Sequence, residues 1–311
     1  ELIAQDSLSF HRLTMPQISV IFFNQSSNKA LADKAVRQAL AHAISKDEMV
    51  ASVLDPVFYS PIDSPVFTSS FAYKNDIKKY AYDTATAARI LKEAGWEHAQ
   101  VADEDIAKAE KEKESKDAAV KESAEKLISI GKGTWLKKKD EFLTIRLTTV
   151  DKTENSMVID AVMKYWEPLG VKVFPEIAPV ASMQSEVIKP KNFEALFYGI
   201  TLGVDPDPYA FWHSSQIERG LNISSFSNKE ADKILEEARQ SVDQGKRREL
   251  YARFQDIIAE ELPAIFLYSS AYDYVQDKKV KGFGTNTIYY PRDRFSDVAD
   301  WYLKTGREID W

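Results

Sequence analysis

The chain has 311 residues, 44% of them hydrophobic and 12% aromatic, which is enough for one large core or two ordinary ones. Its formal net charge of −7 argues against broad nucleic-acid binding through a basic face. It has no cysteine, which excludes disulfides, thiolate nucleophiles and cysteine metal sites, and no apolar run approaches the roughly 18 residues of a membrane-spanning helix.

The first hundred residues predict a buried strand followed by three capped helices. Ile18 to Phe23 is almost wholly apolar and rich in β-formers, which is typical of a buried strand. The first helix runs through Ile44, and Gly95 ends the third as a left-handed residue. Prolines make residues 55–72 an extended loop. Each helix is expected to begin after a side chain that accepts a hydrogen bond from its first turn, namely Asp33, Ser45 and Asp83.

Residues 102–126 differ from their surroundings because Ala, Lys, Glu and Asp make up most of them. Only Ile106 and Val120 are large and apolar in this stretch. We interpret it as a solvated helix or helical hairpin, within an insert that spans about residues 97–139. Two roles are open for the insert: an exposed spacer, because charge runs usually face solvent, or an arm that binds a partner protein.

After the insert, strands and helices alternate. This order with short connections is typical of a parallel α/β layer, in which ligands bind beyond the carboxyl ends of the strands. Farther on, Ser227 and Glu230 have the spacing of a capping box for a helix through Val242. Residues 264–275 are expected to form one bent strand or two short ones. The other elements are strands over 142–150, 171–177 and 193–200, and helices over about 155–169, 183–188 and 246–262.

The segment Tyr198–Asn222 is the strongest candidate for a binding site. It is apolar up to Val204 and then turns through Asp205-Pro206-Asp207-Pro208. Because a residue before proline is driven out of the α region, Asp205 and Asp207 are expected to be extended or turn residues. The predicted strand thus ends in a rigid acidic turn, with aromatic side chains just beyond it. Carboxylates beside flat apolar surface suit recognition of a polar organic ligand.

Six residues of this segment are candidate ligand contacts, and each has a structural alternative. The two carboxylates could close turns on their own backbone. The aromatic side chains could pack in the core, and the asparagine after Gly220 could be a turn residue and not a polar contact to a peptide backbone. The six residues are Asp205, Asp207, Tyr209, Phe211, Trp212 and Asn222.

Catalytic and metal-binding motifs are absent from the sequence. There is no G-x-S-x-G, H-E-x-x-H or Walker-type glycine loop. The four histidines lack the spacing of metal ligands, although His213 leaves metal or heme ligation open as a minor alternative. Asp205 and Asp207 lie on one element, whereas glycosidase carboxylates come from different ones. We therefore expect a binding protein and not an enzyme, with no cofactor and no metal site.

Short motifs follow one another along residues 18–275 in an order that is specific as a combination. They are Phe23-Asn24, Asp33, Val36 to Leu40, Ala43-Ile44, Tyr82-Asp83, Ala88 to Trp96, Asp205 to Trp212, Gly220 to Asn222, Asp232, Ile234-Leu235, Ala238-Arg239, Arg247-Arg248, Tyr251 and Glu260 to Pro263. This order closely resembles family 5 of the extracellular solute-binding proteins, which serve peptide and nickel ABC importers.

The resemblance implies a periplasmic-binding-protein-like fold of type II, an α/β lobe whose mixed sheet is flanked by helices, with the charged helical segment inserted. Whole family members have two lobes joined by a hinge, and the solute lies between them. Residues 24–275 correspond to the C-terminal, substrate-binding lobe. Residues 1–23 belong to or lead from the N-terminal lobe, and residues 276–311 return toward it. The chain is therefore expected to hold only a small part of the N-terminal lobe.

The resemblance further implies a substrate-binding protein of an ABC importer, or its C-terminal lobe. The expected partners are an oligopeptide or other small polar solute and the importer's membrane subunits, with no nucleic acid, and the protein is expected to be a monomer. Its location would be extracytoplasmic, as a periplasmic protein or cell-surface lipoprotein. In the family an acidic residue of the Asp-Pro region commonly pairs with the peptide α-ammonium, and Asp205 is the candidate here. The alternatives are another cargo (nickel chelate, heme or oligosaccharide) or a protein-interaction module that uses the charged insert.

Overall fold

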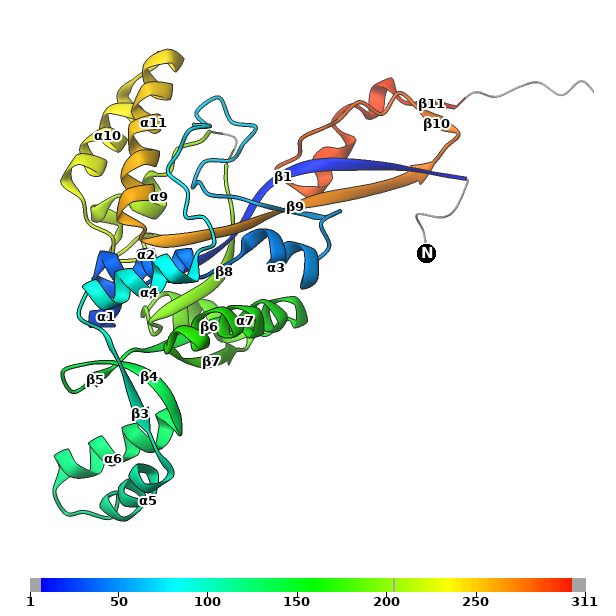
Figure 1. The fold of residues 1–311 in the computed structure, drawn as a ribbon. Coiled ribbons are helices and arrows are strands. Elements are labelled where there is room, and N and C mark those ends of the chain that lie inside the picture. Colours follow the sequence, from blue (N-terminus) through cyan, green and yellow to red (C-terminus); the bar gives the residue numbers. More distant parts are fainter. Residues whose placement is uncertain (1–6, 204, 304–311) are drawn as a thin grey trace, which may run out of the picture.

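A six-stranded mixed sheet forms the centre of the computed structural model, which describes residues 7–203 and 205–303 (Figure 1). Its strand order is β2-β9-β1-β8-β6-β7. Strand β6 is parallel to β7 and β8, which confirms the predicted parallel layer, while β1 is antiparallel to β8 and β9, and β2 to β9. The strands are β1 (Leu8–Phe23), β2 (Tyr59–Pro61), β6 (Thr144–Val150), β7 (Lys172–Ala178), β8 (Ala195–Thr201) and β9 (Ala264–Asp277).

Alternating side chains of the central strands build two hydrophobic cores, one on each face of the sheet. On β1, Ile21 and Phe23 belong to one core and Val20 and Phe22 to the other, as the two-residue period of a strand requires. The first face is covered by α1 (Lys29–Ala32), α2 (Lys34–His42), α3 (Lys46–Ser52), α4 (Thr84–Glu93) and α7 (Thr153–Trp166), which η2 (Glu167–Leu169) extends. The second face is covered by η3 (Met183–Ile188), which follows the short α8 (Val180–Ser182), and by α9 (Tyr209–Trp212), α10 (Lys229–Gln240) and α11 (Gln244–Glu261).

Local sequence decides where most helices begin. The side chains of Asp33, Ser45 and Asp83 accept hydrogen bonds from first-turn N–H groups of α2, α3 and α4, as predicted. Gly95 follows α4 with a φ of +86°. The prediction of Ser227 as the cap of α10 is wrong. Asn228 caps that helix instead, since its side-chain oxygen accepts the N–H groups of Glu230 and Ala231.

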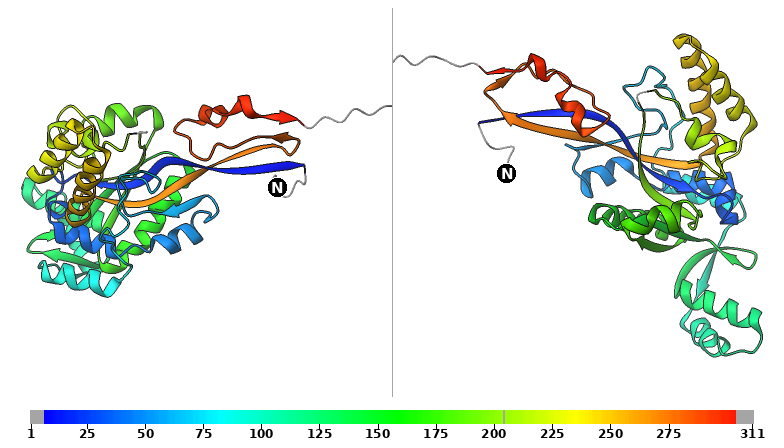
Figure 2. Two further views of the ribbon diagram at one scale, coloured as in Figure 1. Left: turned by 90° about the horizontal axis from the view of Figure 1, so that it is seen from above. Right: turned by 180° about the vertical axis from the view of Figure 1, so that it is seen from behind.

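Strands β1 and β9 continue beyond the sheet as a two-stranded ribbon. Strand β1 begins at Leu8, well before the predicted start at Ile18, and its residues 8–14 pair with residues 271–277. Strand β9 is a single strand, in agreement with the bent-strand alternative, and the register shifts between Thr14 and Ile18. The ribbon projects from the body (Figure 2). Beside it lie β10 (Val280–Lys281), β11 (Tyr302–Leu303), η5 (Pro291–Phe295) and η6 (Val298–Asp300).

Parts of three expected segments lie outside the described residues. They are residues 1–6 of the expected segment 1–23, residues 304–311 of the expected segment 276–311, and Val204 in the apolar run before the acidic turn.

The insert is a small unit of its own at the lower end of the molecule (Figure 1). The predicted helical hairpin is present as α5 (Asp103–Glu112) and α6 (Ala118–Ile130). It packs on an unpredicted three-stranded sheet of β3 (Glu97–Val101), β4 (Gly133–Lys138) and β5 (Glu141–Phe142). Val101, Ile130 and Trp135 form its core. The N–H of Leu136 donates to the carbonyl of Gly170 at 2.7 Å, which ties the insert to the body.

Candidate functional site

The acidic turn lies where the parallel part of the sheet ends. Strand β8 stops at Thr201, and the N–H of Leu202 donates to the carbonyl of Pro16 on β1 at 2.7 Å. Asp205 and Asp207 therefore stand just beyond the carboxyl end of β8, at the edge where α/β sheets bind ligands.

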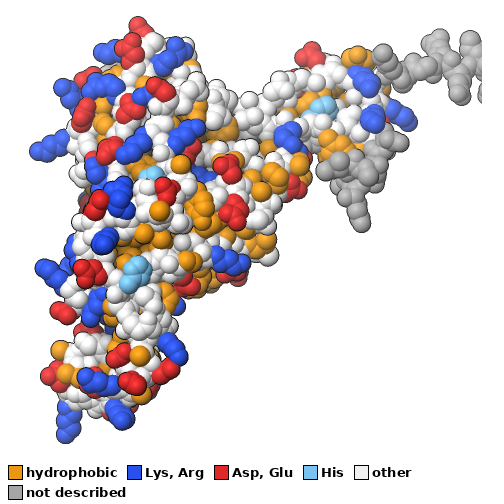
Figure 3. Space-filling model, in the orientation of Figure 1, with side chains coloured by type: hydrophobic (Ala, Val, Ile, Leu, Met, Phe, Trp, Pro, Cys, Tyr) orange, Lys and Arg blue, Asp and Glu red, His pale blue; other side chains and the backbone are white. Residues whose placement is uncertain are grey.

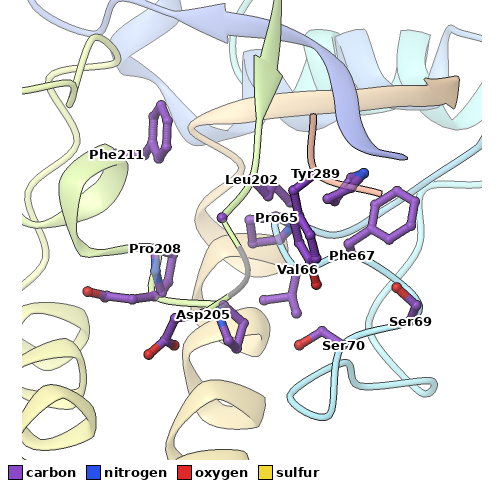
Figure 4. A pocket seen from close by; sticks show the side chains of 14 residues that line it. Pro65, Val66, Phe67, Ser69, Ser70, Leu202, Asp205, Pro208, Phe211 and Tyr289 are labelled. Atoms are coloured by element: carbon purple, nitrogen blue, oxygen red, sulfur yellow. The ribbon is translucent and has the colours of Figure 1, made fainter. Parts of the chain in front are cut away.

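A small pocket of about 60 Å³ opens at this edge (Figure 4). Four separate stretches of chain line it: the bend of β1, the loop after β2, the end of β8 with the acidic turn, and the segment after β10. Most of the wall is apolar, and prolines keep much of its backbone stiff. A pocket of this size holds one group and not a whole peptide. The lining residues are Pro16, Pro65, Val66, Phe67, Ser69, Ser70, Leu202, Gly203, Asp205, Pro206, Asp207, Pro208, Phe211 and Tyr289.

Asp207 closes a turn on its own backbone and pairs with an arginine. Its Oδ1 accepts the N–H of Tyr209 at 3.0 Å, the Asx turn that was the structural alternative for this residue. Its Oδ2 accepts from Nε of Arg239, on α10, at 2.6 Å. The Arg239 guanidinium also lies 4.0 Å from the centre of the Tyr209 ring, a cation–π contact that fixes both side chains.

Asp205 pairs with a second arginine, Arg247 on α11. The Nη2 of Arg247, which contacts Asp205, also donates to the hydroxyl of Tyr251 at 3.2 Å. The Arg247 guanidinium lies 5.6 Å from the ring centre of Phe71. Hydrogen bonding to Asp205, together with that to Tyr251, raises the pKa of Arg247. Burial raises the pKa of the Tyr251 phenol. The acidic turn is thus attached to two helices by two ion pairs.

The aromatic residues after the turn divide between the pocket and the core. Phe211 is partly buried and lines the pocket. Tyr209 stacks on His213 with ring centres 4.1 Å apart and does not line it. Trp212 is 1% exposed and packs against Phe22 and Phe266 of the central strands. Its contacts are those of a core residue.

Asn222 is fully buried and holds a backbone turn together. Its amide nitrogen donates to the carbonyls of His213 and Phe226, and its oxygen accepts the N–H of Phe226 at 3.1 Å. The side chain therefore has the turn role that the sequence left open. His213 is also internally satisfied: Nδ1 lies 2.8 Å from the hydroxyl of Ser215 and Nε2 3.3 Å from a carboxylate oxygen of Glu236.

Sequence reasoning missed about half of the pocket wall. The loop Pro65–Ser70 and Tyr289 reach the pocket from far along the chain, and only the prolines of the loop marked it as extended. It also missed the arginine partners of the two aspartates. Arg239 and Arg247 belong to the family motifs of the sequence, but their pairing with the aspartates was not visible, because ion pairs across about 30 to 40 positions leave no local pattern.

The described part of the chain contains no group of three or more side chains arranged to hold a metal ion. Within the same residues, no helix is long and apolar enough to cross a bilayer.

The fold and the sequence both match known solute-binding proteins. Residues 2–220 match the family model described as bacterial extracellular solute-binding proteins, family 5 Middle. The chain is 27% identical over 282 residues to the oligopeptide-binding protein AppA of Bacillus subtilis, a match covering 89% of this chain and 45% of AppA. It is 23% identical over 285 residues to a dipeptide-binding protein of Escherichia coli, covering 88% of this chain and 45% of that protein.

Solved structures give the same result. The AppA structure from B. subtilis, in complex with a nonapeptide, superposes with a TM-score of 0.73 at 24% identity, covering 96% of this chain and 53% of AppA. NikZ from Campylobacter jejuni, in complex with Ni(L-His), also gives a TM-score of 0.73, at 20% identity, covering 96% of this chain and 54% of NikZ. The fold is that of a periplasmic-binding-protein-like α/β lobe.

The chain belongs to family 5 of the bacterial extracellular solute-binding proteins. It spans about half the length of the relatives it matches.

Proposed function

We propose that the chain is the greater part of the C-terminal lobe of an oligopeptide-binding protein that feeds an ABC importer outside the cytoplasm. The observation that carries the proposal is the pocket beyond β8, which combines an apolar wall with hydroxyl and carboxylate groups at the ligand-binding edge of the sheet. The oligopeptide- and dipeptide-binding relatives support peptides as the cargo.

The pocket supplies one wall of a cleft in this proposal. A second lobe, contributed by further sequence of the intact protein, closes on it and excludes water. Main-chain hydrogen bonds to an extended peptide give affinity that does not depend on its sequence. The pocket of about 60 Å³ accepts one side chain of that peptide, with Phe211, Leu202 and Phe67 as its apolar contacts (Figure 4).

The β1–β9 ribbon fits the role of the connection between lobes. Residues 8–14 and 271–277 leave the body together, and the segment from Val280 to Leu303 accompanies them (Figure 1). We assign the projecting residues 8–14 and 271–303 to the hinge and the other lobe, and the body, which includes the last part of β1, to the substrate-binding lobe.

Calorimetry of the intact protein tests the cargo. A pool of di- to pentapeptides should bind with a dissociation constant in the micromolar range or below, about −8 kcal/mol or stronger. Ni(L-His) and heme serve as competing cargoes. Tight binding of either one, with no heat from any peptide, would contradict peptides as the cargo and leave the family assignment in place.

A matched pair of variants ties binding to the pocket. Phe211→Ala removes part of the apolar wall and should weaken peptide binding about tenfold. Val242→Ala, at a side chain fully open to solvent after α10, should leave the affinity unchanged. Equal affinity for the Phe211 variant would place the peptide elsewhere.

A further inference from the structure

We infer that this site does not use Asp205 or Asp207 as the receptor for a peptide's α-ammonium, and that Arg239 and Arg247 are the positioning residues that impose this specificity. The inference rests on the proposed peptide function and narrows its substrate class. Solutes would be bound through uncharged groups at this wall, so that peptides with a blocked amino terminus are accepted as well as free ones.

Both carboxylate oxygens of Asp207 already accept a hydrogen bond from the protein. One oxygen closes the Asx turn on Tyr209 and the other accepts from Arg239 at 2.6 Å. Its side chain is only 20% exposed. An ammonium group that replaced Arg239 would also break the cation–π contact with Tyr209, whose ring centre lies 4.0 Å from the guanidinium. Substituting one cation for the other therefore gains little.

The Asp205 side chain is more open, at 59% exposed, but its partner Arg247 is largely buried. The Arg247 side chain is 19% exposed and is enclosed by the hydroxyl of Tyr251 and the rings of Tyr251 and Phe71. A ligand ammonium that displaced Arg247 from Asp205 would leave a largely buried guanidinium without its anion. Removing one partner of such a pair is costly, so the pair resists displacement.

The electrostatics of the turn point the same way. Each of the two carboxylates is paired with one guanidinium group, and the formal charges of each pair cancel. The long-range attraction that an unpaired aspartate would exert on an ammonium group is therefore largely removed. The remaining pocket wall carries apolar side chains and the hydroxyls of Ser69, Ser70 and Tyr289, which suit uncharged groups (Figure 4).

Calorimetry of the intact protein with two matched pentapeptide pools, one with free amino termini and one N-acetylated, tests the inference. The wild-type protein should bind both pools with affinities within about twofold of each other. Arg239→Gln and Arg247→Gln each release a carboxylate, and should create a preference of about tenfold for the free pool. Arg239→Lys and Arg247→Lys keep the positive charge and should stay near the wild-type ratio.

The ratio of affinities separates a specificity role from a merely structural one, because a loosened fold would weaken both pools alike. A wild-type preference of tenfold or more for free peptides, removed by Asp205→Asn, would overturn the inference while leaving the peptide function in place. An unchanged ratio in both Arg→Gln variants would also overturn it. Binding of neither pool would overturn the proposed function and this inference with it.

Discussion

At the scale of single residues, the buried arginine Arg37 joins two helix ends. Its side chain is 2% exposed, and its guanidinium donates to the carbonyls of Leu31, Ala32, Glu261 and Leu262. These carbonyls end α1 and α11, where the last C=O groups lack partners within the helix. The partial negative charge of two helix ends compensates the guanidinium. From the sequence, Arg37 follows the inward-facing Val36 and its expected role is structural ion pairing, whereas the hydrogen-bond partners in the structure are backbone carbonyls.

We therefore predict that Arg37→Lys lowers the free energy of unfolding by about 2–4 kcal/mol, because one ammonium cannot reach all four carbonyls and those left over stay buried. Urea unfolding followed by circular dichroism measures the change. Arg89→Lys on α4, where the side chain is 59% exposed, is the matched control and should change stability by less than about 0.5 kcal/mol. Equal stability of the two variants would contradict the assigned role.

Asn222 gives a second residue-scale prediction. Because its side chain is fully buried and makes three hydrogen bonds to backbone, Asn222→Ala should lower the free energy of unfolding by about 1–3 kcal/mol. Peptide affinity of the folded variant should stay at the wild-type value, as calorimetry below its unfolding temperature can show. A variant of normal stability that has lost peptide binding would restore Asn222 as a ligand contact.

At the scale of elements, Glu154 at the start of α7 joins that helix to two strands. Its carboxylate accepts the hydroxyls of Tyr59 on β2 and Tyr268 on β9, at 2.9 Å and 3.1 Å. Burial, together with the hydrogen bond to Glu154, raises the pKa of Tyr59 to about 12. Burial raises that of Tyr268 as well. Both phenols are therefore held neutral in the folded state.

This arrangement predicts alkaline instability. Unfolded tyrosine titrates near pH 10, so above about pH 10 the unfolded chain releases protons that the folded protein retains. The stabilisation is fully present below about pH 10 and is lost as the pH rises toward about 12. Tyr59→Phe should reduce the fall of the urea unfolding midpoint between about pH 8 and about pH 11. Tyr302→Phe, at a residue 53% exposed, is the control, and an equal effect of both changes would contradict the prediction.

The insert is the clearest case of an element that is separable from the site. Val101 on β3 and Gly133 on β4 are directly paired, so an Asn-Gly turn can replace Ala102 to Lys132 and join the two strands as a hairpin. Charged side chains of both signs cover much of the visible face of the insert (Figure 3). We predict that this shortened variant loses the helical signal of α5 and α6, measured by circular dichroism. Its peptide affinity, measured by calorimetry, should be unchanged. Loss of peptide binding would show that the insert takes part in the site.

Elements set by local chemistry were predictable from the sequence, and elements set by distant partners were not. The caps at Asp33, Ser45 and Asp83 and the ending at Gly95 depend on a few neighbouring residues, and all four were predicted. Strand β3 and the first half of β1 depend on pairing with β4 and β9, and neither was recognised. The candidate site divides in the same way: the acidic turn was visible in the sequence, whereas the loop Pro65–Ser70 and Tyr289 join it only through the fold.

At the scale of the whole molecule, the projecting ribbon is the part that most needs a partner. Over residues 8–13, one edge of β1 has no strand partner among the residues that the structure describes. Tyr290, Val298, Tyr302 and Leu303, on the accompanying segment, are each more than half exposed. An open strand edge beside exposed apolar side chains pairs readily with another chain. In the proposed intact protein, the other lobe supplies that cover.

The same reasoning predicts how the chain behaves alone. One wall of a cleft, with a pocket of about 60 Å³, cannot enclose a peptide or exclude water from its hydrogen bonds. The isolated 311-residue chain should therefore bind the pentapeptide pool at least about a hundredfold more weakly than the intact protein, as parallel calorimetry can show. Light scattering should detect self-association of the isolated chain, and Leu303→Lys, which places a charge at an exposed apolar side chain beside the ribbon, should reduce it. Equal affinity of the chain and the intact protein would mean that this lobe carries the complete site.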